Sequence, residues 1–148
     1  MIEQLIKKEN IVVNAHADSW QQAINLSLQQ LVKNGYCTDE YETAVLKSTE
    51  ENGFYYCLTD DLALIHAKAF EAVNQTQLAV TVLDSPVAFS DEHPNIRILV
   101  TLVAKDGNTH MEGIMVVANI FGDDDKASDI INATSADEIY DLFINSVE

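Results

Sequence analysis

The sequence predicts an α/β fold with a mixed central β-sheet and helices on both faces. Two long runs, Gln77–Leu83 and Ile96–Ala104, are almost wholly apolar. Continuous apolar strands are usually covered on both faces, so helices should pack on each side of the sheet. Hydrophobic residues make up 47% of the 148 residues, and we find no linker or internal repeat. We therefore expect one domain, residues 1–148, with a sizeable core.

The first part of the chain is expected to form a short helical turn, a strand and two helices. The strand is predicted at Asn10–Asn14, and Asp18 can cap the helix that follows. Gly35 should end that helix. Its apolar face combines Trp20, Ala23, Ile24, Leu28, Leu31 and Val32. Acidic residues after Thr38 favour the start of a second helix, which should run to about Glu51.

Two short strands are expected before the long ones. They span Phe54–Leu58 and Leu62–Ile65, and the polar turn Thr59–Asp61 joins them. After the long strands, Asn108 or Thr109 can cap a helix that runs through Phe121.

The C-terminal part should add two more helices. Asp123–Ala133 forms a weaker, acidic pattern, and Ser135 and Glu138 have the spacing of a capping box. The last helix should turn four apolar residues inward: Ile139, Leu142, Phe143 and Val147.

Charge and composition narrow the classes of partner. The formal net charge of -16 would repel phosphate backbones and anionic lipid, so we expect no nucleic-acid partner. Transient docking to basic proteins is favoured instead. The N-terminus lacks a leader pattern and no apolar run approaches a membrane span, which predicts a cytoplasmic protein without membrane insertion. Cys37 and Cys57 have neither the number nor the spacing of a disulfide framework or zinc site, so we expect reduced thiols.

Histidines are the candidate functional residues. His66 follows an apolar strand and precedes the small Ala67, whereas His110 lies in the first turn of a predicted helix. Unpaired amides at a helix start favour an anion there. Each of these histidines alone fits a structural role equally well. His16 and His93 lie in polar surroundings, and His16 with Asp18 offers too few ligands for a metal, so we assign no metal and no cofactor.

The order of these features resembles the enzyme IIA domains of the mannitol/fructose class in the bacterial phosphoenolpyruvate-dependent sugar phosphotransferase system. The ascorbate-specific type is the nearest variant. The resemblance covers nearly the whole chain. It is carried by Asn52-Gly53-Phe54-Tyr55, Asp106-Gly107-Asn108-Thr109-His110, Gly113-Ile114-Met115 and Val117-Ala118-Asn119-Ile120-Phe121.

The resemblance implies a phosphocarrier. His66 would accept a phosphoryl group from phospho-HPr and pass it to a cysteine of enzyme IIB, which serves the membrane transporter IIC. His110 would stabilise the group, and Lys68 and Thr109 would bind it. Neither Cys37 nor Cys57 is the acceptor. The transported substrate implied by the nearest variant is ascorbate or a related sugar acid.

The residues around His66 depart from the family pattern. Ile65 stands where the family has proline, Thr59-Asp60-Asp61 replaces an Ala-Pro-Gly turn, and Lys68-Ala69 replaces Arg-Pro. These changes motivate an alternative: a regulatory interaction module of the same fold that signals phosphorylation state without feeding a transporter. The sequence leaves open the oligomeric state, a homodimer included, and the ring nitrogen that would carry the phosphoryl group.

Overall fold

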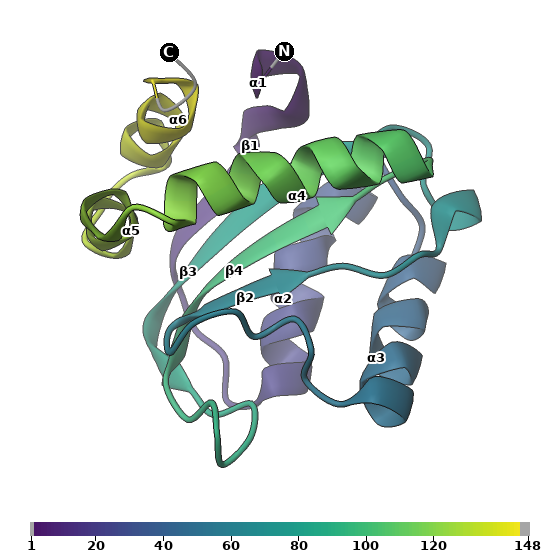
Figure 1. Ribbon diagram of the computed structural model, residues 1–148, viewed down its shortest axis with the longest axis horizontal. Coiled ribbons are helices and arrows are strands. Elements are labelled where there is room, and N and C mark those ends of the chain that lie inside the picture. Colours follow the sequence, from purple (N-terminus) through teal and green to yellow (C-terminus); the bar gives the residue numbers. More distant parts are fainter. Residues whose placement is uncertain (1, 146–148) are drawn as a thin grey trace.

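The computed structural model describes residues 2–145 and arranges them as a four-stranded sheet between two layers of helices (Figure 1). The strands are β1 (Ile6–Ala15), β2 (Leu62–Ile65), β3 (Gln77–Val87) and β4 (Ile96–Val103). The helices are α1 (Ile2–Leu5), α2 (Trp20–Lys33), α3 (Glu40–Asn52), α4 (Gly107–Phe121), α5 (Asp124–Ile131) and α6 (Ala136–Asn145), with a 3-10 turn, η1, at Phe70–Ala72.

The sheet is mixed, with strand order β1-β3-β4-β2. The outer pairs, β1 with β3 and β2 with β4, are parallel, and the central pair β3 and β4 is antiparallel. The two long central strands are buried along almost their whole length. The predicted fold class is confirmed, because the apolar central strands are covered on both sides as a buried sheet requires.

Each face of the sheet has its own apolar core. On one face, Ile65 and Leu99 pack with residues of α2 and α3 such as Leu28 and Val45. On the other face, Leu64 and Val100 pack with α4, α5 and α6. Consecutive residues of a strand point to opposite faces, so the unbroken apolar runs supply both cores at once.

Two helix caps differ from those expected. Ser19, not Asp18, caps α2, since its hydroxyl accepts from the Gln22 N–H at 3.1 Å. The Asp18 carboxylate lies instead 2.8 Å from Nε2 of His16. At α4 the cap is Asp106, not Asn108 or Thr109, and its carboxylate accepts from the Thr109 N–H.

Of the two hydrogen bonds of the capping box predicted before α6, one is formed. The Ser135 hydroxyl accepts from the Glu138 N–H at 3.2 Å, whereas the Glu138 carboxylate accepts from the Thr134 hydroxyl. Ile139 and Phe143 are fully buried. Leu142 is half-buried against the same core, and Val147 lies outside the described residues.

The predicted strand Phe54–Leu58 is wrong. This segment is a turn that makes one isolated bridge, between Cys57 and Ala63. It nevertheless bonds to the outer edge of β2: the Leu58 N–H donates to Leu62 at 3.0 Å, and the Leu64 N–H donates to Tyr56 at 2.8 Å. Aromatic packing rather than a ladder fixes the segment, because the Phe54 ring meets those of Trp20, Tyr56 and Phe89 edge-on at centroid distances of 5.1 to 6.1 Å.

Both cysteines are free thiols, as expected. Cys37 is buried and Cys57 is half-buried. Burial raises the pKa of each thiol to about 11, with a smaller contribution from Asp39 at Cys37. Both therefore stay protonated and weakly nucleophilic near neutral pH.

Candidate functional site

His66 and His110 meet at one end of the sheet. His66 directly follows β2, and His110 lies in the first turn of α4, which begins soon after β4 ends. Because β2 and β4 are parallel, their carboxyl ends lie at the same edge (Figure 1). The two imidazole centroids are 5.5 Å apart. The structure therefore brings together the two histidines that the sequence singled out.

The protonation state of His66 follows from one short hydrogen bond. Its Nδ1 lies 2.6 Å from the carbonyl oxygen of Leu64. A carbonyl oxygen can only accept, so Nδ1 carries the hydrogen and the lone pair of the neutral ring is on Nε2. Burial lowers the pKa of His66 below its ordinary value of 6.5, against the opposing effect of this hydrogen bond. The ring is therefore neutral at physiological pH, with its lone pair on Nε2.

His110 is held by the start of α4. Its backbone N–H donates to the Asp106 carbonyl at 3.0 Å. The imidazole packs edge-on against the Phe70 ring, with centroids 5.9 Å apart. The residue is 6% exposed, and its Nδ1 has no hydrogen-bond partner within residues 2–145. Burial lowers the pKa of His110, with smaller electrostatic contributions from His66 and Lys68 in the same direction. A buried, unpaired ring nitrogen can be satisfied by an incoming ligand.

The two histidines line an open cleft of about 480 Å³. Lys68, which the sequence analysis selected as a binding residue, contributes an exposed cation to its wall. Thr109, the other residue selected for binding, does not line this cleft. Its hydroxyl is 2.7 Å from that of Thr76 and 2.9 Å from the Asp106 carboxylate, so it supports the helix cap.

Three lining residues were not selected from the sequence: Ser48, Asn52 and Tyr55. They come from α3 and the turn after it. The Tyr55 hydroxyl donates to the His66 carbonyl at 2.6 Å. Asn52 and Tyr55 belong to a segment that carries the family resemblance, and that resemblance was the signal that could have found them.

The acidic turn before β2 lies away from the histidines. Asp60 and Asp61 precede this strand and His66 follows it. A strand of four residues spans roughly 13 Å. The Thr59 hydroxyl donates to the Asp61 carboxylate at 2.9 Å, which keeps that charge within the turn. These carboxylates therefore do not oppose an anion beside His66.

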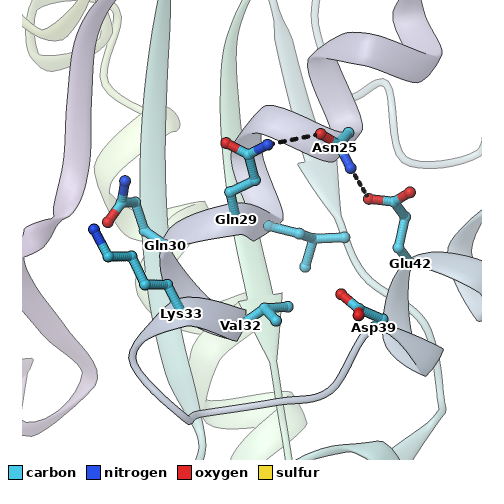
Figure 2. A pocket seen from close by; sticks show the side chains of 8 residues that line it. Asn25, Gln29, Gln30, Val32, Lys33, Asp39 and Glu42 are labelled. Carbon is cyan, nitrogen blue, oxygen red and sulfur yellow. Dashed lines mark hydrogen bonds between the residues drawn. The ribbon is translucent and has the colours of Figure 1, made fainter.

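A second hollow, between α2 and α3, offers no comparable chemistry (Figure 2). Gln29 donates to Asn25 at 3.0 Å, and Asn25 donates to Glu42 at 2.7 Å, which links the two helices. Its lining contains no histidine or thiol among the described residues. This hollow is a polar helix contact rather than a candidate active site.

The described part of the chain shows no arrangement for a metal or a membrane span. No group of three or more His, Cys, Asp or Glu side chains in residues 2–145 is placed to hold a metal ion. The His16 ring bonds Asp18 through Nε2 and Asp84 through Nδ1, as an exposed ion pair. No helix in this range is long and apolar enough to cross a membrane.

Fold and site together define a class of α/β/α protein: one with a neutral histidine at the end of a parallel strand, beside the first turn of a helix. The family model described as "Phosphoenolpyruvate-dependent sugar phosphotransferase system, EIIA 2" matches residues 4–146. The chain belongs to this family, which confirms the resemblance found in the sequence.

Relatives and solved structures agree with this assignment. The chain is 32% identical over 142 residues to the "Ascorbate-specific PTS system EIIA component" of Shigella boydii serotype 4, covering 95% of this chain and 92% of that protein. It superposes on the mannitol-specific cryptic phosphotransferase enzyme IIA of Escherichia coli with a TM-score of 0.84, at 26% identity and 95% coverage of both chains. It also superposes on the mannitol enzyme IIA of Escherichia coli that was solved in complex with phosphorylated enzyme IIB. The TM-score is 0.83 at 26% identity, covering 95% of this chain and 99% of that one.

Proposed function

We propose that this protein is the phosphocarrier enzyme IIA of a sugar phosphotransferase system, with His66 as the residue that is phosphorylated. The observation that carries the proposal is the hydrogen bond from Nδ1 of His66 to Leu64, which leaves the lone pair on Nε2 of a neutral ring. Phosphoryl transfer needs an unprotonated nucleophile in line with the leaving group and donors around the equatorial oxygens. His66 supplies the first requirement.

The transfer can be written as two displacements. Nε2 of His66 attacks the phosphorus of phospho-HPr, a new N–P bond forms, and the N–P bond to the donor histidine breaks. The thiolate of an enzyme IIB cysteine then attacks the same phosphorus, and His66 leaves with its lone pair restored. Throughout, His110 and Lys68 lie beside His66 in the cleft, where the Lys68 cation can offset the charge of the phosphoryl oxygens and the His110 ring can hydrogen-bond them.

The partners and the substrate follow from the relatives. Because one solved relative is a complex of enzyme IIA with phosphorylated enzyme IIB, we propose an equivalent enzyme IIB partner here, and through it a membrane IIC transporter. Ascorbate or a related sugar acid is the proposed substrate, because the curated relatives are ascorbate-specific. We place the protein in the cytoplasm, where HPr and enzyme IIB would meet it.

Reconstitution tests this function. The protein is incubated with enzyme I, HPr and labelled phosphoenolpyruvate, and the labelled residue is located by mass spectrometry. We expect label on His66 and its loss when cognate enzyme IIB is added. A protein that is labelled on His66 but does not discharge to enzyme IIB would support the regulatory alternative. Absence of label on His66 would overturn the proposal.

A further inference from the structure

The segment that carries His66 lacks regular secondary structure. β2 ends at Ile65, and the next regular element is η1, which begins at Phe70. Ile65 also lacks the fixed backbone dihedral that a proline would supply at this position. Misplacing a reacting atom by about 1 Å can reduce a rate about a hundredfold, so a nucleophile on such a segment needs other restraints.

Tyr41, from α3, restrains the peptide that follows His66. Its hydroxyl accepts from the Ala67 N–H at 2.9 Å, and its hydrogen can be donated to the Leu102 carbonyl at 2.7 Å or to the Ala67 carbonyl at 3.0 Å. Leu102 lies in β4, just beyond the last residue that pairs with β2. The fully buried hydroxyl thus ties the end of β2 to the neighbouring strand where the ladder stops. Burial raises the pKa of Tyr41, so the phenol stays protonated and keeps both roles.

Tyr55 restrains His66 itself from the cleft. Its hydroxyl donates to the His66 carbonyl at 2.6 Å, and its ring meets the imidazole edge-on, with centroids 5.3 Å apart and planes at 87°. The Ser48 hydroxyl donates to that of Tyr55 at 3.2 Å, which anchors the tyrosine to α3. Tyr55 is 39% exposed, so its hydroxyl adds little to the buried core.

We propose that Tyr55 is a positioning residue for phosphoryl transfer at His66, an inference that rests on the proposed function. Its hydroxyl fixes the His66 carbonyl, while its ring restricts rotation of the imidazole, so that Nδ1 stays on the Leu64 carbonyl and Nε2 stays presented to the partner. Tyr41 holds the next peptide in place. The two tyrosines supply the rigidity that Ile65 cannot.

Two substitutions separate the effect of the Tyr55 hydroxyl from the effect of its ring. Tyr55→Phe removes the hydrogen bond and keeps the ring, and Tyr55→Ala removes both. Tyr36→Phe is the matched control, because it removes a tyrosine hydroxyl that donates to Glu9 at 3.4 Å, outside the cleft. In single-turnover transfer from phospho-HPr, we expect the maximal rate to fall about two- to tenfold for Tyr55→Phe, the effect of one net hydrogen bond. For Tyr55→Ala we expect a fall of about a hundredfold.

Two further readouts distinguish positioning from docking and from folding. The phospho-HPr concentration that gives half-maximal rate should stay unchanged in Tyr55→Phe. In the absence of any donor, imidazole ¹⁵N signals of the wild type should show a hydrogen on Nδ1 of His66, and Tyr55→Ala should shift them toward a mixture of both tautomers. Tyr36→Phe should match the wild type in every readout.

Three outcomes would overturn the inference: a wild-type rate in both Tyr55 variants, a raised half-maximal concentration with an unchanged maximal rate, or a slower rate with unchanged His66 signals in Tyr55→Ala. The last two would make Tyr55 a partner contact. Wild-type protein that takes no label on His66 would instead contradict the proposed function, so the two failures are distinguishable.

Discussion

The imidazole rings of His66 and His110 lie 5.5 Å apart between centroids, with their planes inclined at 55°. The first ring lies on the loop after an edge strand, and the second is buried in the first turn of α4. A group bonded to the first ring comes within reach of the second. The arrangement therefore pairs the more exposed ring of His66 with the more deeply buried ring of His110, whose Nδ1 has no hydrogen-bond partner within residues 2–145.

Replacing His66 should abolish phosphorylation and leave the fold intact. The His66→Ala variant loses the Nε2 lone pair, and the segment is still held by Tyr41 through the Ala67 peptide. Intact-mass measurement after incubation with phospho-HPr should show no adduct, and circular dichroism should match that of the wild type. An undiminished adduct would assign the carrier role to another histidine.

Replacing His110 should slow transfer more than it weakens docking. The loss of a charge-assisted hydrogen bond to a phosphoryl oxygen is worth about 1.5 to 3 kcal/mol, or roughly a ten- to hundredfold lower rate. Single-turnover rates for His110→Ala, in both transfer directions, measure this effect. Wild-type rates would restrict His110 to the structure of α4.

The pKa values of His66 and His16 should lie on opposite sides of 6.5, the ordinary value for histidine. Burial disfavours the charged form of His66 and lowers its pKa, whereas Asp18 and Asp84 stabilise the charged form of exposed His16 and raise its pKa. As pH falls, His16 should take a proton first, and His66 should remain neutral at pH 7. One NMR titration reports both rings, with His16 as the internal control. The reverse order would contradict the burial of His66.

Two glycines of α4 should respond oppositely to alanine. A Cβ at Gly113 would lie 2.5 Å from Cδ1 of the fully buried Leu102, whereas a Cβ at Gly107 meets nothing within 4 Å. Overpacking costs about 1 to 3 kcal/mol, and replacing glycine by alanine in a helix gains about 1 kcal/mol. Gly113→Ala should therefore lower the free energy of unfolding, and Gly107→Ala should not. Urea denaturation compares them, and equal stabilities would mean that Leu102 moves aside freely.

Association with HPr or enzyme IIB should slow with added salt. The net charge of -16 attracts a basic partner patch at long range, and screening shortens that attraction to about 8 Å at physiological ionic strength. Stopped-flow binding across a salt series should show the change mainly in the association rate. A salt-independent rate would place the acidic surface away from the docking face.

Local pattern was enough to predict most elements of the fold. The apolar runs at β3 and β4 and the amphipathic face of α2 follow from periodicity alone. The error at Phe54–Leu58 arose because its aromatic rings pack against Trp20 and Phe89, which are distant in sequence. The cap of α2 was misplaced because Asp18 pairs with His16, and either Asp18 or Ser19 suits a helix start.

Local pattern also predicted part of the candidate site. His66 and His110 were identified by their places at the ends of predicted elements, and the structure brings them together. Tyr41 and Tyr55 were missed because their hydroxyls act on main-chain groups of His66, Ala67 and Leu102. No spacing rule in a single sequence reveals such long-range bonds.

The bonds between the Phe54–Leu58 turn and β2 also affect how another protein can reach His66. β2 is an edge strand, and exposed edges invite a foreign chain to add a strand. Here the Leu62 carbonyl and the Leu64 amide of β2 are already bonded to the protein's own turn. A visiting protein must therefore recognise this side through side chains rather than by extending the sheet. Such contacts can form and separate without breaking a main-chain ladder, which suits the proposed carrier, since it would have to release one partner before it meets the next.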